Sequence, residues 1–361
     1  MEDVFRLLQR QLDQYSVGFP ATGSGIEIEI LKRLFSEKEA HMFLDMSLLL
    51  EDAASAAART GRDPAQTAEL LEDMAKKGLL FRLRRADKIR YAAVPFVVGI
   101  YEFQLKNMER GLADMVERYF DEAFTKSIAS ITVPMRTIPV NRSLDVSFPV
   151  APHEDAREIL KIQKKLAVAE CICRKQQDLV GKGCDRPREV CMVFGSHADY
   201  FVENGLARYI TVDEGLEILD AAEKGGLVNQ PFNVVNPGGM CNCCGCCCGV
   251  LKALNRLPRP ADMVCSNYHA RVDEALCSGC GVCEDRCQMA AIELADDIAR
   301  VDLDRCIGCG LCVTTCPTGA VTLAAVSEGA RKTPPAGAQD LMMKIAAERG
   351  TSVMPLRMQG K

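Results

Sequence analysis

The sequence predicts an α+β protein made of several domains, and three observations lead to this prediction. The chain has 361 residues, the length of two or three ordinary domains. Its first 130 residues combine helical patterns with one hairpin pattern. Its nineteen cysteines include C-x2-C spacings, which in an intracellular chain indicate metal thiolates rather than disulfides. We expect an N-terminal domain over residues 1–130, a cysteine-rich α/β domain over 131–265, a repeat domain over 266–325, and a linker with a C-terminal helix over 326–361.

The N-terminal domain begins with helical patterns. Residues 26–35 carry apolar side chains at helical spacing, and residues 51–59 are alanine-rich and suit a short helix. After a turn, Asp63 is placed to cap a helix whose first residue is Pro64. Gly78 is placed to end that helix.

A hairpin follows, because residues 79–83 and 88–93 alternate like two strands around Ala86 and Asp87. The order of helix, short helix, turn, helix and hairpin is similar to that of the winged-helix fold. The helix that would enter a DNA groove carries four acids that phosphates repel, namely Asp63, Glu69, Glu72 and Asp73. The hairpin is basic instead, with Arg82, Arg84, Arg85, Lys88 and Arg90. We therefore expect the domain to dock a protein or to form a homodimer, with DNA binding as the alternative.

Four further helices are predicted along the chain. Residues 102–130 carry an apolar face that suits the core or a dimer seam. Residues 153–166 form a second helix, and residues 211–224 form a third that opens on a capping box at Thr211. After a proline-rich linker, residues 338–349 are expected to form a short helix that packs on the body or on a partner.

The middle domain contains two groups of cysteines. The first has the spacing C-x-C-x10-C-x6-C and comprises Cys171, Cys173, Cys184 and Cys191. The second places six cysteines in eight residues, namely Cys241, Cys243, Cys244, Cys246, Cys247 and Cys248. Neutral buried cysteines behave as small hydrophobes and do not cluster in this way, and adjacent free thiols are prone to oxidation. We expect the two groups to face each other around metal, with Gly245 bending the second group.

The sequence leaves several alternatives for the metal content of the middle domain. The first group alone could hold one [4Fe–4S] cluster and the second group most of another, so we expect one or two additional iron–sulfur clusters. Zinc and a redox-active dithiol are the alternatives. Arg174 and Lys175 would offset the negative charge of a cluster, hold an anionic substrate, or simply be solvated. His197 is expected in the core or at the surface, with a ligand or proton-donor role as the alternative.

The repeat domain carries the spacing C-x2-C-x2-C-x3-C twice, at an offset of 29 residues. The first run comprises Cys277, Cys280, Cys283 and Cys287, and the second Cys306, Cys309, Cys312 and Cys316. Three cysteines of such a run ligate one cubane cluster, and the fourth ligates the other. We therefore assign Cys277, Cys280, Cys283 and Cys316 to one [4Fe–4S] cluster, and Cys306, Cys309, Cys312 and Cys287 to a second.

These residues resemble the bacterial-type 2[4Fe–4S] ferredoxin. Pro317 follows the fourth cysteine of the second run, as in that family, but Gln288 stands at the matching position of the first run. The resemblance implies a ferredoxin-like dicluster fold that transfers electrons, with zinc ribbons or disulfides as the alternatives. The middle domain looks like the modules that stand beside ferredoxin domains in anaerobic redox proteins.

Net charge and hydropathy limit which molecules the chain is expected to bind. The chain has a net charge of −5, and residues 270–325 contain nine acids against four arginines. This acidic module is expected to steer a basic redox partner, whereas nucleic acid is disfavoured. No apolar run reaches the 18 residues of a membrane span, and the N-terminus lacks a signal-peptide pattern, so we expect a cytoplasmic protein.

The sequence contains no G-x-G-x-x-G or G-x4-G-K-[ST] motif, no Ser-His-Asp order and no H-E-x-x-H motif. We therefore predict an iron–sulfur electron-transfer protein of anaerobic metabolism, a component of an oxidoreductase. Its two [4Fe–4S] clusters would exchange electrons with redox partner proteins and with the middle metal centre. One alternative is a reductase that binds substrate at an open iron site of the middle cluster. Another is a redox-sensing winged-helix regulator.

Overall fold

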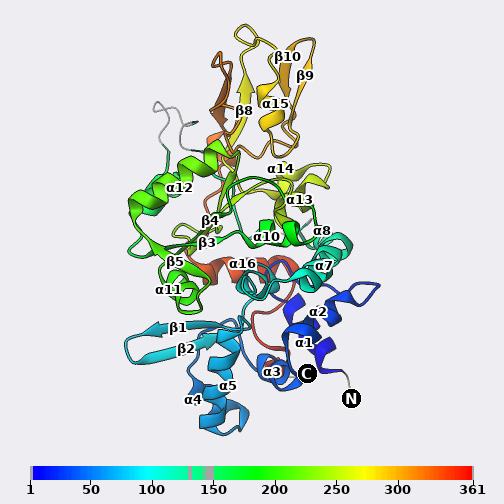
Figure 1. Ribbon diagram of the computed structural model, residues 1–361, viewed down its shortest axis with the longest axis vertical. Coiled ribbons are helices and arrows are strands. Elements are labelled where there is room, and N and C mark those ends of the chain that lie inside the picture. Colours follow the sequence, from blue (N-terminus) through cyan, green and yellow to red (C-terminus); the bar gives the residue numbers. More distant parts are fainter. Residues whose placement is uncertain (1–2, 129–131, 141–142, 144–149, 360–361) are drawn as a thin grey trace.

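The computed structural model describes residues 3–128, 132–140, 143 and 150–359. It is an α+β structure of several parts stacked along one long axis (Figure 1). The N-terminal helices occupy one end, a five-stranded sheet lies in the middle, and the cysteine-repeat domain forms the other end. The predicted α+β class is therefore confirmed.

The N-terminal helices follow the apolar patterns of the sequence. They are α1 (Val4–Asp13), α2 (Ile26–Leu34), α3 (Glu37–Phe43), α4 (Ala53–Thr60) and α5 (Pro64–Lys76). Asp63 caps α5 by accepting a hydrogen bond from the Gln66 amide, and Pro64 is the first residue of that helix, as predicted. The hairpin consists of β1 (Phe81–Arg85) and β2 (Lys88–Ala92), which pair antiparallel. The predicted order of elements is present, and the winged-helix assignment itself stays a prediction.

The hairpin packs against the middle domain. Arg82 in β1 is 3% exposed and donates hydrogen bonds to Glu72 at 2.8 Å and to Glu203 at 2.6 Å. Arg84 is paired with the same two carboxylates. Two of the five basic side chains predicted for the wing are thus engaged within the chain, and Glu203 belongs to α11 (Ser196–Glu203) of the middle domain.

The predicted single helix over residues 102–130 is wrong. The described part of this segment is divided into α6 (Tyr101–Phe103), α7 (Arg110–Tyr119), a wider π-helical turn η2 (Phe120–Phe124) and α8 (Thr125–Ile128). The break lies before α7 because the Glu109 side chain accepts hydrogen bonds from the amides of Gly111 and Leu112, which makes it a helix N-cap. Another irregular turn, η1 (Phe96–Ile100), precedes α6.

The middle domain is built on one antiparallel sheet with the strand order β5-β3-β4-β7-β6. The strands are β3 (Leu166–Glu170), β4 (Glu189–Phe194), β5 (Ala207–Ile210), β6 (Val228–Pro231) and β7 (Gly239–Cys243). Its helices are η4 (Pro152–Glu154), α9 (Ala156–Lys161), α10 (Ile172–Leu179), α11, α12 (Val212–Lys224), α13 (Gly249–Asn255) and α14 (Pro260–Met263). The helix predicted over residues 153–166 is shorter than expected, because Asp155 caps α9 and the chain enters β3 at Leu166. Thr211 caps α12 as predicted.

The cysteine-repeat domain consists of two small hairpin-like pairs and one short helix. Strand β8 (Tyr268–Val272) pairs with β11 (Val321–Ala325), and β9 (Ile292–Ala295) pairs with β10 (Ile298–Val301). The helix α15 (Val282–Arg286) follows the first two cysteines of the first run and contains the third, Cys283. Each pair thus joins a strand beside the first cysteine run to a strand beside the second.

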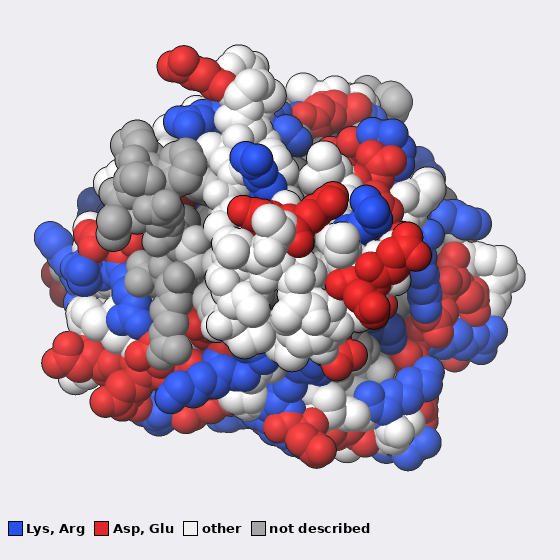
Figure 2. Space-filling model, turned by 90° about the horizontal axis from the view of Figure 1, so that it is seen from above, with Lys and Arg blue, Asp and Glu red and all other residues white. Residues whose placement is uncertain are grey.

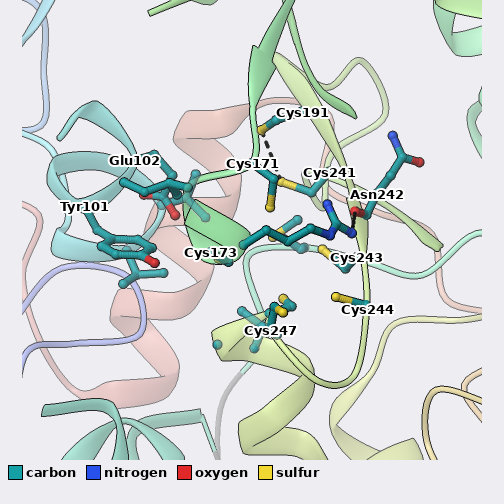
Figure 3. Close-up of a pocket in the computed structure, with 18 of the residues that line it drawn as sticks. Tyr101, Glu102, Cys171, Cys173, Cys191, Cys241, Asn242, Cys243, Cys244 and Cys247 are labelled. Atoms are coloured by element: carbon teal, nitrogen blue, oxygen red, sulfur yellow. Dashed lines mark hydrogen bonds between the residues drawn. The ribbon is translucent and has the colours of Figure 1, made fainter. Parts of the chain in front are cut away.

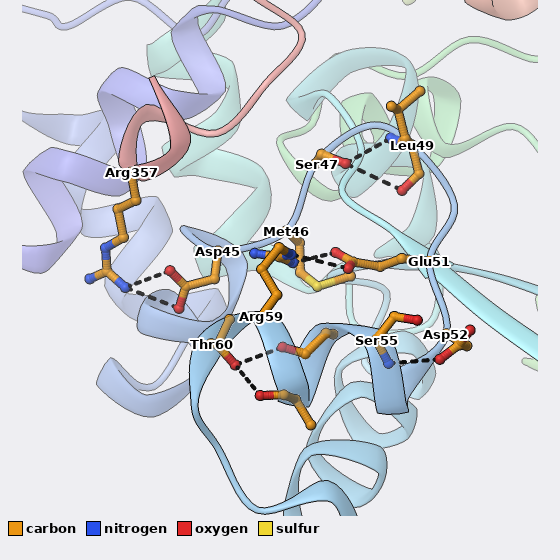
Figure 4. Close-up of polar contacts among 12 residues, drawn as sticks. Asp45, Met46, Ser47, Leu49, Glu51, Asp52, Ser55, Arg59, Thr60 and Arg357 are labelled. Carbon is orange, nitrogen blue, oxygen red and sulfur yellow. Dashed lines mark hydrogen bonds and ion pairs between the residues drawn. The ribbon is translucent and has the colours of Figure 1, made fainter. Parts of the chain in front are cut away.

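The C-terminal segment returns to the N-terminal domain. After η5 (Glu328–Ala330), helix α16 (Ala338–Arg349) lies between the middle sheet and the N-terminal helices (Figure 1). Arg349 donates to the backbone carbonyl of Ser16 at 3.2 Å. Beyond it, η6 (Leu356–Met358) places Arg357 against the Asp45 carboxylate at 3.0 Å (Figure 4). No helix within the described residues has the length and apolar character that crossing a membrane requires.

Candidate metal centres

The eight cysteines of the repeat domain surround two separate cavities. Cys277, Cys280, Cys283 and Cys316 line one cavity. Cys287, Cys306, Cys309 and Cys312 line the other. The backbone thus brings the fourth cysteine of each run to the first three of the other, which is the arrangement that the crossed ligation of two cubane clusters requires.

The backbone around these cavities is shaped for anionic sulfur. The amides of Ala270, Ala291 and Ala299 donate to the sulfurs of Cys306, Cys287 and Cys277 at 3.3, 3.2 and 3.5 Å. Such bonds favour the thiolate form and tune the potential of a bound cluster. The chain also approaches itself closely here, because a Cβ at Gly308 would lie 2.1 Å from the Tyr268 carbonyl oxygen.

Gln288 connects the repeat domain to the cysteine run of the middle domain. Its side-chain oxygen accepts a hydrogen bond from the Gly245 amide at 2.8 Å, and its backbone oxygen accepts one from Asn255 at 2.9 Å. Gly245 stands between Cys244 and Cys246, and Gln288 directly follows Cys287. The departure from the expected proline in the first run therefore has a structural reason, since proline has no side chain that could accept this bond.

A third, larger cavity lies between the N-terminal helices and the middle sheet. Eight cysteines line it, namely Cys171, Cys173, Cys191, Cys241, Cys243, Cys244, Cys247 and Cys248 (Figure 3). These cysteines come from strands, from helices and from the turns next to them. Cys171 follows β3, Cys248 precedes α13, and Cys191 in β4 faces Cys241 in β7 with their sulfurs 3.8 Å apart. The two sequence groups thus face each other across one space, as expected.

The buried guanidinium of Arg174 indicates whether this cavity suits an anionic cluster. Arg174, in α10, is 1% exposed and donates to the backbone oxygen of Asn242 at 3.0 Å. Its Nε and Nη1 atoms lack a hydrogen-bond partner among the described residues. A buried guanidinium with unpaired donors is costly unless negative charge lies beside it. A thiolate-ligated iron–sulfur cluster in the cavity supplies that charge, so the residues present fit such a group.

The structure divides the ten cysteines of the two middle-domain groups differently from the grouping that the sequence suggested. Cys184 does not join Cys171, Cys173 and Cys191 at the cavity. Its sulfur lies with those of Cys244, Cys246 and Cys247, and these four sulfurs are all within 4.8 Å of one another. Cys265 belongs to neither group.

Sequence reasoning missed Glu102, which lines the large cavity together with Tyr101. In Figure 3 these two residues lie on one side, with Cys241, Cys243 and Cys244 on the other. Burial raises the pKa of Glu102 to about 8, even though the Gly99 amide donates to its carboxyl group at 2.6 Å. The carboxyl group is therefore protonated at neutral pH. The available signal was one acid inside the apolar run from Val94 to Phe103.

Two other residues singled out from the sequence lie away from this cavity. His197 stacks on Phe81 with ring centroids 4.9 Å apart, and burial lowers the pKa of its imidazole to about 4. It is a partly exposed histidine that packs against aromatic rings, and it does not line the cavity. Lys175 donates to the Leu105 carbonyl oxygen at 2.6 Å, so the charge that reaches the cavity is that of Arg174.

Comparison with known proteins bears on the C-terminal part of the chain. Residues 270–323 match a family described as the 4Fe-4S dicluster domain. Searches of curated proteins and of solved structures find no match to the chain. The match covers both cysteine runs and the strands that flank them. Together with the two cysteine-lined cavities, it identifies residues 270–323 as a 4Fe–4S dicluster domain.

Proposed function

We propose that this chain is an electron-transfer component of an oxidoreductase. Its dicluster domain would exchange electrons with an iron–sulfur centre in the large cavity of the middle domain. When bound, such clusters supply one-electron transfer at potentials that thiolate ligation and amide hydrogen bonds adjust. The proposed ligands in the dicluster domain are the four cysteines around each small cavity. Those in the middle domain are Cys171, Cys173, Cys191, Cys241, Cys243 and Cys248.

The observation that carries the proposal is the contact between Gln288 and Gly245. It places the residue after Cys287 in direct hydrogen-bond contact with the turn that contains Cys244 and Cys246. Arg286 adds a second contact, since it donates to the Lys224 carbonyl oxygen at the end of α12 at 3.0 Å. The dicluster domain is therefore seated on the cysteine-rich domain through the segment that supplies one of its proposed cluster ligands.

The far end of the dicluster domain suits a redox partner. Figure 2 views the molecule from this end and shows a surface free of charged side chains that is bordered by acidic and some basic ones. Val282, which lines the cavity of Cys280, is 39% exposed, and Leu276, next to Cys277 in the chain, is 52% exposed. Arg286 and Arg305, two of the domain's four arginines, are bonded toward the middle domain, which leaves this end more acidic. A partner with a basic rim around an apolar patch would be steered to it.

The relay is tested with Gln288→Leu, which removes the bond to Gly245. The full chain is reduced anaerobically through its dicluster domain, and the reduction of each centre is followed by rapid-freeze EPR. We expect unchanged iron content but slower reduction of the middle centre. Pro317→Gln, at the matching position of the second run, is the control and should leave the rate unchanged. Equal rates in all three proteins would refute the relay through this contact.

A second function, reduction of a substrate at the large cavity, is favoured by one specific observation. The protonated carboxyl group of Glu102 faces the cysteines and could supply a proton to a bound substrate. A general acid of this kind is expected at a reductase site and has no use in a simple relay. Small-molecule binding that perturbs the EPR signal of the middle centre, and that Glu102→Gln weakens, would support it. If no added small molecule changes the EPR signal of the middle centre, substrate reduction at the large cavity is excluded and only the electron relay remains.

A further inference from the structure

Four cysteines of the middle domain draw their sulfurs unusually close together. Cys184 comes from the loop between α10 and β4, and Cys244, Cys246 and Cys247 come from the turn between β7 and α13. The sulfur of Cys247 lies 3.6 Å from that of Cys184 and 3.7 Å from that of Cys246. A disulfide needs about 2.0 Å. The four residues are therefore free thiols gathered around one point.

These separations match one metal ion rather than a cluster. An ion with metal–sulfur bonds of about 2.3 Å in tetrahedral geometry holds its ligand sulfurs about 3.8 Å apart. The thiolates of a cubane bind four different irons and must lie farther apart. Accordingly, within the described part of the chain, the Cys184 group is the one set of three or more candidate ligands whose atoms all lie within 4.8 Å of one another. The cysteines around the two dicluster cavities are spaced more widely.

The group is also distinct from the large cavity. Cys184 and Cys246 do not line that cavity, whereas Cys244 and Cys247 lie at its wall. We propose that Cys184, Cys244, Cys246 and Cys247 form a closed site for a single, tetrahedrally coordinated, thiophilic metal ion, which is zinc or one iron. The ten cysteines would then divide into four for this ion and six for the centre in the cavity. This inference does not depend on the proposed electron relay.

The surroundings support a charged thiolate site with a structural role. Four thiolates around a divalent ion carry a net charge of −2, and Arg186 Nη1 donates to the Cys246 sulfur at 3.3 Å. The ion would tie the loop of Cys184 to the turn that contains Gly245. That turn is the one that Gln288 contacts. The site would therefore hold in place the surface on which the dicluster domain sits.

The test is elemental analysis of the anaerobically purified full chain, with sulfide determination, for wild type, Cys184→Ser and Cys265→Ser. Cys265 lies outside both groups and serves as the matched control. We expect Cys184→Ser to lose about one metal ion per chain with no loss of sulfide or of cluster EPR signal, and Cys265→Ser to lose nothing. X-ray absorption at the edge of the lost metal should show a sulfur shell near 2.3 Å. For zinc, it should show no metal–metal scattering.

Loss of one zinc ion or of one iron ion would each support the proposed site, and the elemental analysis shows which of the two metals the site holds. Loss of several irons together with sulfide in a folded Cys184→Ser protein would overturn the proposal, as would loss of no metal. Circular dichroism checks folding. If Cys184→Ser unfolds, Cys246→Ser gives the same readout from an exposed position, and Co²⁺ added to metal-depleted wild type should show the visible absorption of a tetrahedral thiolate site.

Discussion

At the scale of single residues, the structure shows where charge and backbone shape would act on bound metal. Arg174 is the clearest case, because its buried guanidinium lacks partners for Nε and Nη1 among the described residues. Gly308 is another, because its φ of +67° and the nearby Tyr268 carbonyl leave no room for a side chain. Each residue leads to a separate prediction.

Arg174→Gln should lower the reduction potential of the middle centre. A unit charge in van der Waals proximity to the centre, in an effective dielectric of about 20, contributes roughly 2–3 kcal/mol. For one electron this corresponds to about 100 mV. Removing the positive charge disfavours the more negative, reduced state. Anaerobic redox titration followed by EPR measures the shift, and Lys175→Gln is the neighbouring control with a much smaller expected effect. Equal potentials in both variants would contradict the placement of Arg174 beside the centre.

Gly308→Ala should remove the iron held by Cys287, Cys306, Cys309 and Cys312. The added Cβ would meet the Tyr268 carbonyl oxygen at 2.1 Å, so the backbone of the loop must shift. Gly281→Ala is the control, since its φ of +76° is similar but its nearest neighbour is Leu294 at 3.5 Å. It should retain its iron at a stability cost of about 1 kcal/mol. Iron analysis and EPR measure both. Full iron in Gly308→Ala would show that the loop is not shaped as described.

At the scale of elements, Glu117 joins three helices across the boundary between the N-terminal and middle domains. It lies in α7 and is 7% exposed. Gln176 of α10 and Lys252 of α13 donate to its carboxylate at 3.0 and 2.9 Å. Burial acts to raise the pKa of Glu117, but hydrogen bonds from Lys252, Lys182 and Gln177 outweigh it and bring the pKa to about 2. This boundary also contains the large cavity.

Glu117→Gln should destabilise the contact between these helices by about 2–3 kcal/mol. The folded pKa lies below the usual 4.5, so the carboxylate stabilises the fold above about pH 4.5 and loses that effect as pH falls toward 2. Denaturant unfolding at pH 7 and pH 3 of metal-free protein measures the effect, and the difference between wild type and variant should shrink at pH 3. Asp114→Asn, in an exposed pair with Arg110 on the same helix, should change stability far less. A constant difference at both pH values would refute the assigned role.

The elements also show what the sequence could predict. Local signals located α5 and α12, because Asp63 and Thr211 are helix caps that act within a few residues. The sequence predicts one helix over residues 102–130 because glutamate is a weak signal for a helix N-cap, so the break before α7 at Glu109 is missed. The repeat of C-x2-C-x2-C-x3-C located the two dicluster cavities, since each ligand run is local. The division of the ten clustered cysteines of the middle domain depends on how β4 and β7 pair, which is a long-range property that their spacing does not contain.

At the scale of the whole molecule, the middle domain lies between two others, and each of these contributes residues to its proposed metal sites. Tyr101 and Glu102 come to the large cavity from the N-terminal domain, and Gln288 comes to the cysteine turn from the dicluster domain. The C-terminal segment contacts the N-terminal end through Arg349, which donates to the Ser16 carbonyl, and through Arg357, which pairs with Asp45 (Figure 4). We infer that the N-terminal domain and the dicluster domain help to position the cysteine-lined centre of the middle domain.

The central claim is that the chain carries an iron–sulfur centre in addition to its dicluster domain. Iron and acid-labile sulfide determination on anaerobically purified full-length protein, with EPR spin counting, tests it most directly. The two proposed [4Fe–4S] clusters account for about eight irons. We predict clearly more than eight irons and more than eight sulfides per chain, with an EPR signal beyond those of the two clusters. Eight irons or fewer, with the cavity cysteines oxidised in pairs or holding only zinc, would contradict the account.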